Sequence, residues 1–106
     1  MDTILTFAML KENPVIGEVV LAIIKERERQ DSKWGPPEDL PKDRTPADWF
    51  VILMEEVGEL SKNIVEFNAD PEPDWKMMIK DELIHTAASA ISWLEWLAVQ
   101  GQRKEE

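Results

Sequence analysis

Two pairs of residues have the types and the spacing that could hold a divalent cation, Glu56 with Glu59 and Glu82 with His85. Residues three apart on an α-helix lie near each other on one face. With about 100° between successive residues and Leu53 taken as zero, Glu56 falls near 60° and Glu59 near 120°. Both carboxylates are therefore expected to point together, beside the apolar core stripe of their helix.

Glu82 is expected on a face of the last helix that otherwise carries apolar and small polar residues, with His85 nearby. A carboxylate in such surroundings is costly unless a partner pairs with it. Two antiparallel helices could direct the two pairs at each other and form one acidic pocket, in which mutual repulsion raises the carboxylate pKa values. A bound divalent cation removes that conflict, and Mg²⁺ takes oxygen ligands while keeping waters for phosphates.

Each of these residues also has a purely structural interpretation. A pair such as Glu56 and Glu59 is common on solvated helix faces, and a single histidine such as His85 is often an interior or interface residue. Glu55 falls near 200°, opposite the core stripe, and is expected to be solvated. Most other carboxylates, Glu95 among them, are expected on ordinary solvated surface.

A helix expected over residues 15–33 has an apolar stripe that turns charged in its last two turns, where Arg27, Asp31 and Trp34 continue it. This change indicates a face that passes from a core into a cleft. Arg27 or Lys33 could bind phosphate oxygens. Trp34 could stack on a base or pack against the following loop. Alternatively, Arg27 and Asp31 form only an ion pair within the helix.

The composition narrows the classes of protein that could use these residues. The chain has 106 residues, with 12 Lys and Arg against 22 Asp and Glu, and a formal net charge of −10. Such an acidic chain without a basic stripe is a poor ligand for nucleic-acid polymers. Its 4 glycines are isolated, which excludes a glycine-rich phosphate loop. The absence of cysteine excludes thiolate metal sites and fits the cytoplasm, and no apolar run is long enough to span a membrane.

Proline and glycine divide the chain into helical stretches. Breaks are expected at Asn13–Pro14, over residues 35–45 and over residues 70–73. No window alternates as a strand would. We therefore expect one all-α domain over residues 1–106, an antiparallel bundle of four to five helices, in which residues 1–14 form an N-terminal extension and residues 35–45 a loop between helices.

The last two helices differ in how their apolar residues are arranged. The first of them is expected to begin with Thr45 as its cap, Pro46 in its first position and Asp48 in its first turn. Its apolar stripe comprises Trp49, Leu53, Val57, Leu60, Ile64 and Phe67. The last helix, residues 75–99, has a stripe of Ile79, Leu83, Ala87, Ala90, Leu94 and Leu97. Further large apolar residues surround that stripe, so its partners are expected to include another subunit, in a homodimer or homotetramer.

Three segments together resemble a known family. The segments are ERERQDSKWG (Glu26–Gly35), EEVGEL (Glu55–Leu60) and DELIHTAASAISWLEWL (Asp81–Leu97). They resemble the MazG-like nucleotide pyrophosphohydrolases of the all-α NTP pyrophosphatase superfamily, and the resemblance covers residues 15–99. It implies hydrolysis of a nucleoside or deoxynucleoside triphosphate to the monophosphate and pyrophosphate, with Mg²⁺ held by an ExxE pair on one helix and an ExxD pair on another.

Carried over position by position, the resemblance makes Glu56 and Glu59 the first metal-binding pair and Glu82 the first member of the second. Glu55 is the additional leading acid of the first motif. His85 stands where the family has Asp, and imidazole is a better ligand for Mn²⁺ than for Mg²⁺. Three carboxylates with water could then hold the metal, or the site could prefer Mn²⁺, or hydrolysis could be weakened or lost.

The resulting expectation is a cytoplasmic, Mg²⁺- or Mn²⁺-dependent nucleoside triphosphate pyrophosphohydrolase. Its metal site comprises Glu56, Glu59, Glu82 and His85, and its substrate wall comprises Arg27, Asp31, Lys33 and Trp34. The cation would lower the pKa of an attacking water, which Glu59 or Glu55 could orient as general base. The alternative is a catalytically silent helical module of the same fold that binds a nucleotide or a protein partner.

Overall fold

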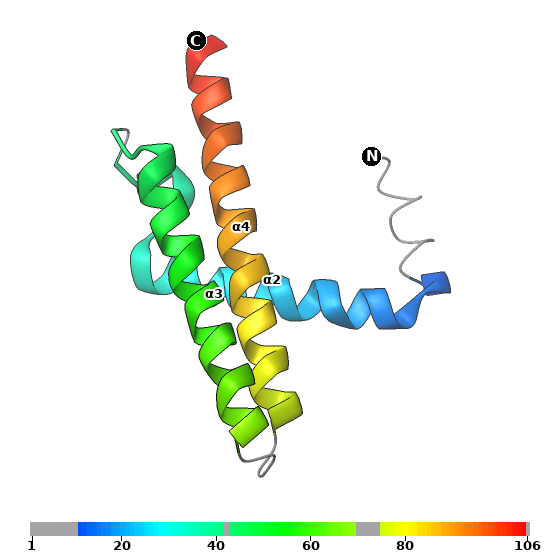
Figure 1. Ribbon diagram of the computed structural model, residues 1–106. Helices are drawn as coiled ribbons and strands as arrows, with labels where there is room; N and C mark the ends of the chain where they lie inside the picture. The colour runs from blue at the N-terminus through cyan, green and yellow to red at the C-terminus, as the bar shows by residue number, and fades with distance from the viewer. Residues whose placement is uncertain (1–10, 42, 70–74, 106) are drawn as a thin grey trace.

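The computed structural model describes residues 11–41, 43–69 and 75–105, and these residues form helices and connecting loops without a strand (Figure 1). Three long helices dominate this part of the chain: α2 (Pro14–Trp34), α3 (Pro46–Ala69) and α4 (Trp75–Glu105). A short 3₁₀ helix, η1 (Pro37–Asp39), interrupts the loop between α2 and α3. The expectation of an all-helical fold is confirmed for these residues. Most of the expected N-terminal extension lies outside them.

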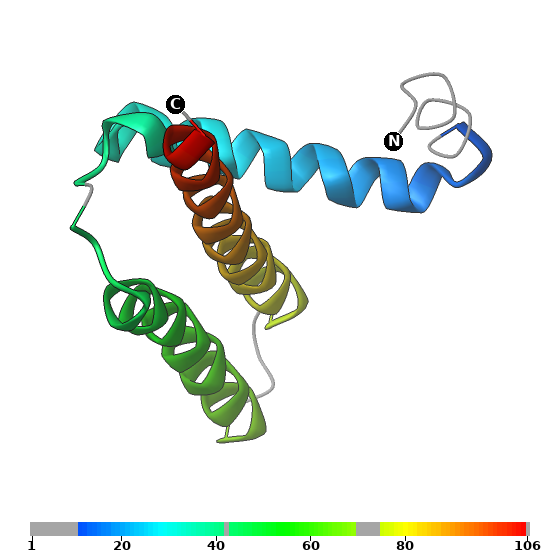
Figure 2. The ribbon, with the colours of Figure 1, turned by 90° about the horizontal axis from the view of Figure 1, so that it is seen from above.

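Helix α4 is central to the arrangement. It runs antiparallel to α3, as the sequence predicted, and α2 crosses it (Figure 1). The view from above shows α4 between α2 and α3 (Figure 2). Helix α4 also contacts η1. Side chains that face inward from α2 and α3 can therefore meet on α4.

Local capping chemistry sets both ends of α2. The Asn13 side chain accepts a hydrogen bond from the Ile16 N–H at 3.2 Å, and Pro14 occupies the first helical position. Gly35 ends the helix with φ of 90°, a conformation that favours glycine because it has no Cβ. Its N–H donates to the Asp31 carbonyl at 2.9 Å. The predicted helix over residues 15–33 is confirmed to within one residue at each end.

Helix α3 begins with the cap that the sequence predicted. The Thr45 hydroxyl accepts the Asp48 N–H at 3.2 Å, and the Asp48 carboxylate accepts the Thr45 N–H at 2.8 Å. This reciprocal pair is a capping box with Asp in the third position. The two hydrogen bonds from Thr45 also hold the pKa of Asp48 below its ordinary value. The first turn of α3 is thus fixed next to the residues that enter the core.

Helix α4 is longer than predicted, since it ends at Glu105 and not near Val99. Gly101 lies inside this extension. A glycine inside a helix costs about 1 kcal/mol relative to alanine, and α4 continues through it. Tertiary contacts along a helix routinely override such a penalty.

Three tryptophans form a cluster between α3 and α4. Trp49 is only 2% exposed, and its ring stacks on that of Trp93 with centroids 6.4 Å apart and planes 7° apart. Trp96 packs against Trp49 in a tilted arrangement at 5.9 Å. Trp49 and Trp96 are buried and Trp93 is half-buried, so the cluster forms part of the core of the single chain.

The predicted apolar stripes of α3 and α4 differ in how far their side chains are buried. On α3 the stripe is buried or half-buried except for Ile64. On α4 three residues of the stripe, Leu83, Leu94 and Leu97, are exposed in the single chain. The helix instead buries the small residues Ala88 and Ser89, which permit close approach of a neighbouring helix. None of the helices in the described ranges is both long and apolar enough to cross a membrane.

Candidate metal centre and adjoining pocket

The antiparallel packing of α3 against α4 brings three of the predicted metal-binding residues together. They are Glu56 on α3 and Glu82 and His85 on α4, and one possible ligand atom from each lies within 4.8 Å of the others. The His85 Nδ1 atom is 3.7 Å from Glu82 Oε2 and 3.9 Å from Glu56 Oε2. All three side chains are only partly exposed. Two carboxylates and an imidazole are a donor set typical of divalent-metal sites.

Glu59 and Glu55 lie outside this cluster of Glu56, Glu82 and His85. Both side chains are exposed. Glu55 nevertheless lines the pocket that adjoins the cluster, together with Glu56. The expectation that Glu55 lies on an ordinary solvated face is therefore too simple, since its exposed carboxylate borders a pocket.

The electrostatics of the cluster fit a cation. Burial raises the pKa of Glu56, and the neighbouring carboxylate of Glu82 raises it further. The Oε2 atom of Glu82 is buried and, within the described part of the chain, has no hydrogen-bond partner. A buried acceptor without a donor is unfavourable in water-poor surroundings. A divalent cation between Glu56 and Glu82 would satisfy this oxygen and relieve the repulsion.

A third carboxylate, that of Glu26 on α2, lies on the other side of His85. Its side chain is 8% exposed, and its Oε1 atom is 3.6 Å from His85 Nε2. Arg29 donates two hydrogen bonds to it, at 2.7 and 2.6 Å. The Arg29 contact holds the pKa of Glu26 below its ordinary value. Glu26 was not predicted to belong to the site. The signal that could have found it is its position three residues after the apolar Ile23, which puts both side chains on one side of α2.

Arg27 is buried in a hydrogen-bonded network that ties α2 to α4. Its guanidinium donates to Glu95 at 2.7 and 3.2 Å, to Asp31 at 2.7 Å and to Gln30 at 2.9 Å. The ion pair between Arg27 and Asp31 is thus present, as the structural interpretation predicted. The expectation that Glu95 is simply solvated is wrong, because its carboxylate binds this arginine across the helix interface.

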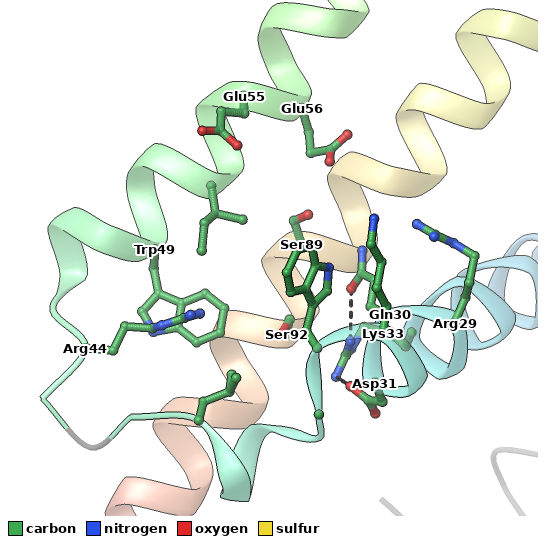
Figure 3. A pocket seen from close by; sticks show the side chains of 15 residues that line it. Arg29, Gln30, Asp31, Lys33, Arg44, Trp49, Glu55, Glu56, Ser89 and Ser92 are labelled. Atoms are coloured by element: carbon green, nitrogen blue, oxygen red, sulfur yellow. Dashed lines mark hydrogen bonds and ion pairs between the residues drawn. The ribbon is translucent and has the colours of Figure 1, made fainter.

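A pocket of about 470 Å³ opens between α2, α3 and α4 beside the cluster (Figure 3). All four residues of the predicted substrate wall line it: Arg27, Asp31, Lys33 and Trp34. Glu55 and Glu56 border it from α3, across from the side chains of α2 (Figure 3). Glu56 thus belongs both to the cluster with Glu82 and His85 and to the pocket wall.

The pocket wall carries cations and aromatic rings, some of which the sequence analysis did not single out. Lys33 Nζ lies 4.9 Å from the centre of the exposed Trp34 ring. The Arg44 guanidinium lies over Trp49 at 4.7 Å, and Arg29 also lines the pocket. Arg44 was missed because it belongs to a loop, whose path across the pocket cannot be inferred from helical spacing. Positive charge and exposed aromatic surface suit an anionic ligand with a planar ring.

Comparison with known proteins assigns neither a family nor a function to the chain. No protein-family profile, no curated sequence and no solved structure matches the chain.

Proposed function

We propose that this protein is a MazG-like, divalent-metal-dependent nucleoside triphosphate pyrophosphohydrolase. It would convert a nucleoside or deoxynucleoside triphosphate to the monophosphate and pyrophosphate. The observation that supports this most strongly is the position of Glu56, which belongs to a carboxylate–imidazole cluster and also lines a pocket that contains basic side chains. A metal held there would face a polyphosphate in the pocket.

The pocket suits a nucleotide in size and chemistry. Its volume of about 470 Å³ lies within the range of about 300–1,000 Å³ that is usual for small-molecule sites. We assign Arg29, Lys33 and Arg44 to binding phosphate oxygens, because their positive charges line the pocket. Trp34 is exposed at the pocket wall and offers a ring on which a base could stack. Arg27 and Asp31 contribute by holding the wall in place through their ion pair.

The hydrolytic step needs a metal site, a water and a base. Bound by Glu56, Glu82 and His85, a divalent cation would neutralise charge on the triphosphate and lower the pKa of an attacking water. Glu55 borders the same pocket with an exposed carboxylate. In this proposal Glu55 orients that water and accepts its proton as general base. Glu59, one helical turn beyond Glu56 and also exposed, is the second candidate for this role.

We also propose that a second copy of the chain completes the bundle to four or five helices. The N-terminal half of α2 extends away from the other helices (Figure 1), and its Val15, Ile16 and Val19 are exposed. Leu83 and Leu94 on α4 are exposed as well. Large exposed apolar surface on a small protein is typical of an interface, so we expect a homodimer or homotetramer. We place it in the cytoplasm, where its substrates are made.

His85 supports a second candidate function. Where the resemblance leads one to expect Asp, the chain supplies an imidazole, which removes one carboxylate from the metal site. A protein with the same pocket but without turnover would bind the nucleotide and release no pyrophosphate. The two candidates predict the same binding and differ in the product.

A panel of nucleoside and deoxynucleoside triphosphates, assayed for released pyrophosphate in Mg²⁺ and in Mn²⁺, separates the candidates. The enzyme is expected to release pyrophosphate from at least one substrate. Glu82→Gln should then lower the rate by more than 100-fold, an order of magnitude typical for loss of a group that acts in the transition state. Asp81→Asn is the matched control, since Asp81 is the exposed neighbour on the same helix. Release by neither metal, with nucleotide binding retained, would favour the binding module.

A further inference from the structure

The imidazole of His85 lies between two groups of carboxylates that differ in how they are held. On its Nε2 side is Glu26 of α2, with Oε1 at 3.6 Å. On its Nδ1 side are Glu82 and Glu56, with oxygens at 3.7 and 3.9 Å. The ring therefore bridges from the α2 wall to the candidate metal cluster. Its two nitrogens face different partners.

Glu26 is the carboxylate with fixed hydrogen-bond partners. Arg29 donates to both of its oxygens, at 2.7 and 2.6 Å, and Gln30 donates to Oε2 at 3.4 Å. Glu26 is 8% exposed, so it is held by these contacts within the packed helices. The Oε2 atom of Glu82 has, among the described residues, no hydrogen-bond donor. Glu26 is thus held in place by hydrogen bonds, whereas Glu82 has an oxygen atom that is available to bind a metal ion.

A neutral imidazole has one N–H and one nitrogen lone pair, and the partner of the N–H decides which nitrogen keeps the lone pair. We propose that Glu26 is a positioning residue for His85, accepting the Nε2–H so that Nδ1 is the nitrogen presented to a metal held with Glu56 and Glu82. The present separation of 3.6 Å exceeds a hydrogen bond of about 3 Å, so the contact shortens by roughly 0.6 Å when the bond forms. This inference rests on the metal site of the proposed function.

The arrangement follows the general pattern in which a carboxylate orients a metal-binding histidine from its far side. Its consequence is metal preference. A site with two carboxylates and one imidazole nitrogen favours Mn²⁺ or Co²⁺ over Mg²⁺, which prefers oxygen ligands throughout. His85 stands where the resemblance leads one to expect Asp, and it then adapts the site to Mn²⁺ or Co²⁺. Glu26 is the carboxylate that positions its imidazole.

The test measures the metal affinity of the purified protein without nucleotide. Mn²⁺ binding is followed by loss of the free-ion electron paramagnetic resonance signal, and Mg²⁺ binding by competition. Glu26→Gln should weaken Mn²⁺ binding about 10- to 100-fold. The reason is that the amide has only one acceptor oxygen, which Arg29 occupies, so its NH₂ group faces His85 and favours the opposite tautomer. Mg²⁺ affinity should change much less.

Two further variants separate positioning from a general effect of charge. His85→Asp should shift preference towards Mg²⁺, and adding Glu26→Gln to it should leave Mn²⁺ affinity unchanged or improve it, because one of two facing carboxylates is removed. Glu28→Gln is the matched control on the exposed side of α2. Bound Mn²⁺ should also show nitrogen coupling in spin-echo spectra of the wild type and not of His85→Asp.

A result that contradicts the positioning role of Glu26 can be distinguished from one that contradicts the proposed metal site. If the wild type binds neither Mn²⁺ nor Mg²⁺ at millimolar concentration, both the inference and the metal site of the proposed function are wrong. If Mn²⁺ binds without nitrogen coupling, or equally well to wild type and Glu26→Gln, the positioning role is overturned while the metal site stands. An equal loss in the His85→Asp background would also overturn it, because Glu26 would then act independently of His85.

Discussion

Arg27 of α2 binds Glu95 of α4 through two hydrogen bonds, at 2.7 and 3.2 Å, across the interface between the two helices. This contact lies one residue from Glu26 and thus anchors the part of α2 that faces His85. The same stretch of α2 lines the pocket. The ion pair therefore connects the packing of the helices to the geometry of the candidate site.

Removing Glu95 should destabilise the protein and loosen the pocket. Glu95→Ala leaves the buried Arg27 with Asp31 and Gln30 as its remaining hydrogen-bond partners among the contacts described. We expect a loss of about 1–2 kcal/mol, less than for a fully buried pair because the Glu95 side chain is 41% exposed. Urea unfolding measures the change, with exposed Asp81→Ala as control. Equal stabilities for the two variants would show that the ion pair contributes little.

Glu56 should make the metal-free protein less stable as the pH rises. Its pKa is raised in the fold by burial and by Glu82, so folding favours the protonated form. The associated stability is complete below the ordinary pKa of 4.5 and is lost as the pH rises through the raised value. In chelator, Glu56→Gln should therefore melt at a higher temperature than wild type at pH 7, and the difference should vanish near pH 4. A lower melting temperature for the variant at pH 7 would contradict this.

Glu82 should matter for metal binding and little for the fold. Its buried Oε2 has, in the described residues, no hydrogen-bond donor to lose, so Glu82→Ala should leave the melting temperature in chelator unchanged or raise it. Mn²⁺ at 100 times its dissociation constant should stabilise the wild type by about 2.7 kcal/mol and the variant much less. Differential scanning fluorimetry with and without metal measures both. A variant that unfolds in chelator would identify Glu82 as a structural residue.

The cap of α3 can be tested separately from the site. Thr45→Ala removes the hydroxyl that accepts the Asp48 N–H and should cost about 1 kcal/mol of stability. The pKa of Asp48 is lowered by its hydrogen bonds with Thr45. Its contribution is thus present above the ordinary value of 3.8 and lost as the pH falls through the lowered one. Thermal unfolding of Thr45→Ala against exposed Ser61→Ala, at pH 7 and below pH 3, checks both statements.

Local sequence patterns predicted the parts of the fold that depend on local chemistry. Asn13, Gly35 and Thr45 act within a few residues, so the ends of α2 and the start of α3 agree with prediction. The two ExxE-like pairs also predicted that Glu56 would meet Glu82 and His85, because their helices pack antiparallel as expected.

The contacts that were not predicted depend on how α2 crosses α4. Helical periodicity fixes the direction of Glu26 and Glu95 around their own axes, but not the crossing angle or the height at which the helices meet. That geometry brings Glu26 to His85 and Arg27 to Glu95. Periodicity likewise did not predict which side of α4 packs within the chain, where Ala88 and Ser89 are buried while Leu83, Leu94 and Leu97 remain exposed.

A ³¹P nuclear magnetic resonance time course tests the proposed hydrolysis most directly. The wild-type protein is incubated with a deoxynucleoside triphosphate and Mn²⁺ or Mg²⁺, and each sample is quenched with chelator before measurement. The three triphosphate signals should give way to those of a monophosphate and pyrophosphate. Glu56→Gln should leave the triphosphate intact, and Glu66→Gln, an exposed glutamate of the same helix, should behave as wild type. Triphosphate signals that persist with the wild type, across the common deoxynucleotides and both metals, would contradict the proposed hydrolysis.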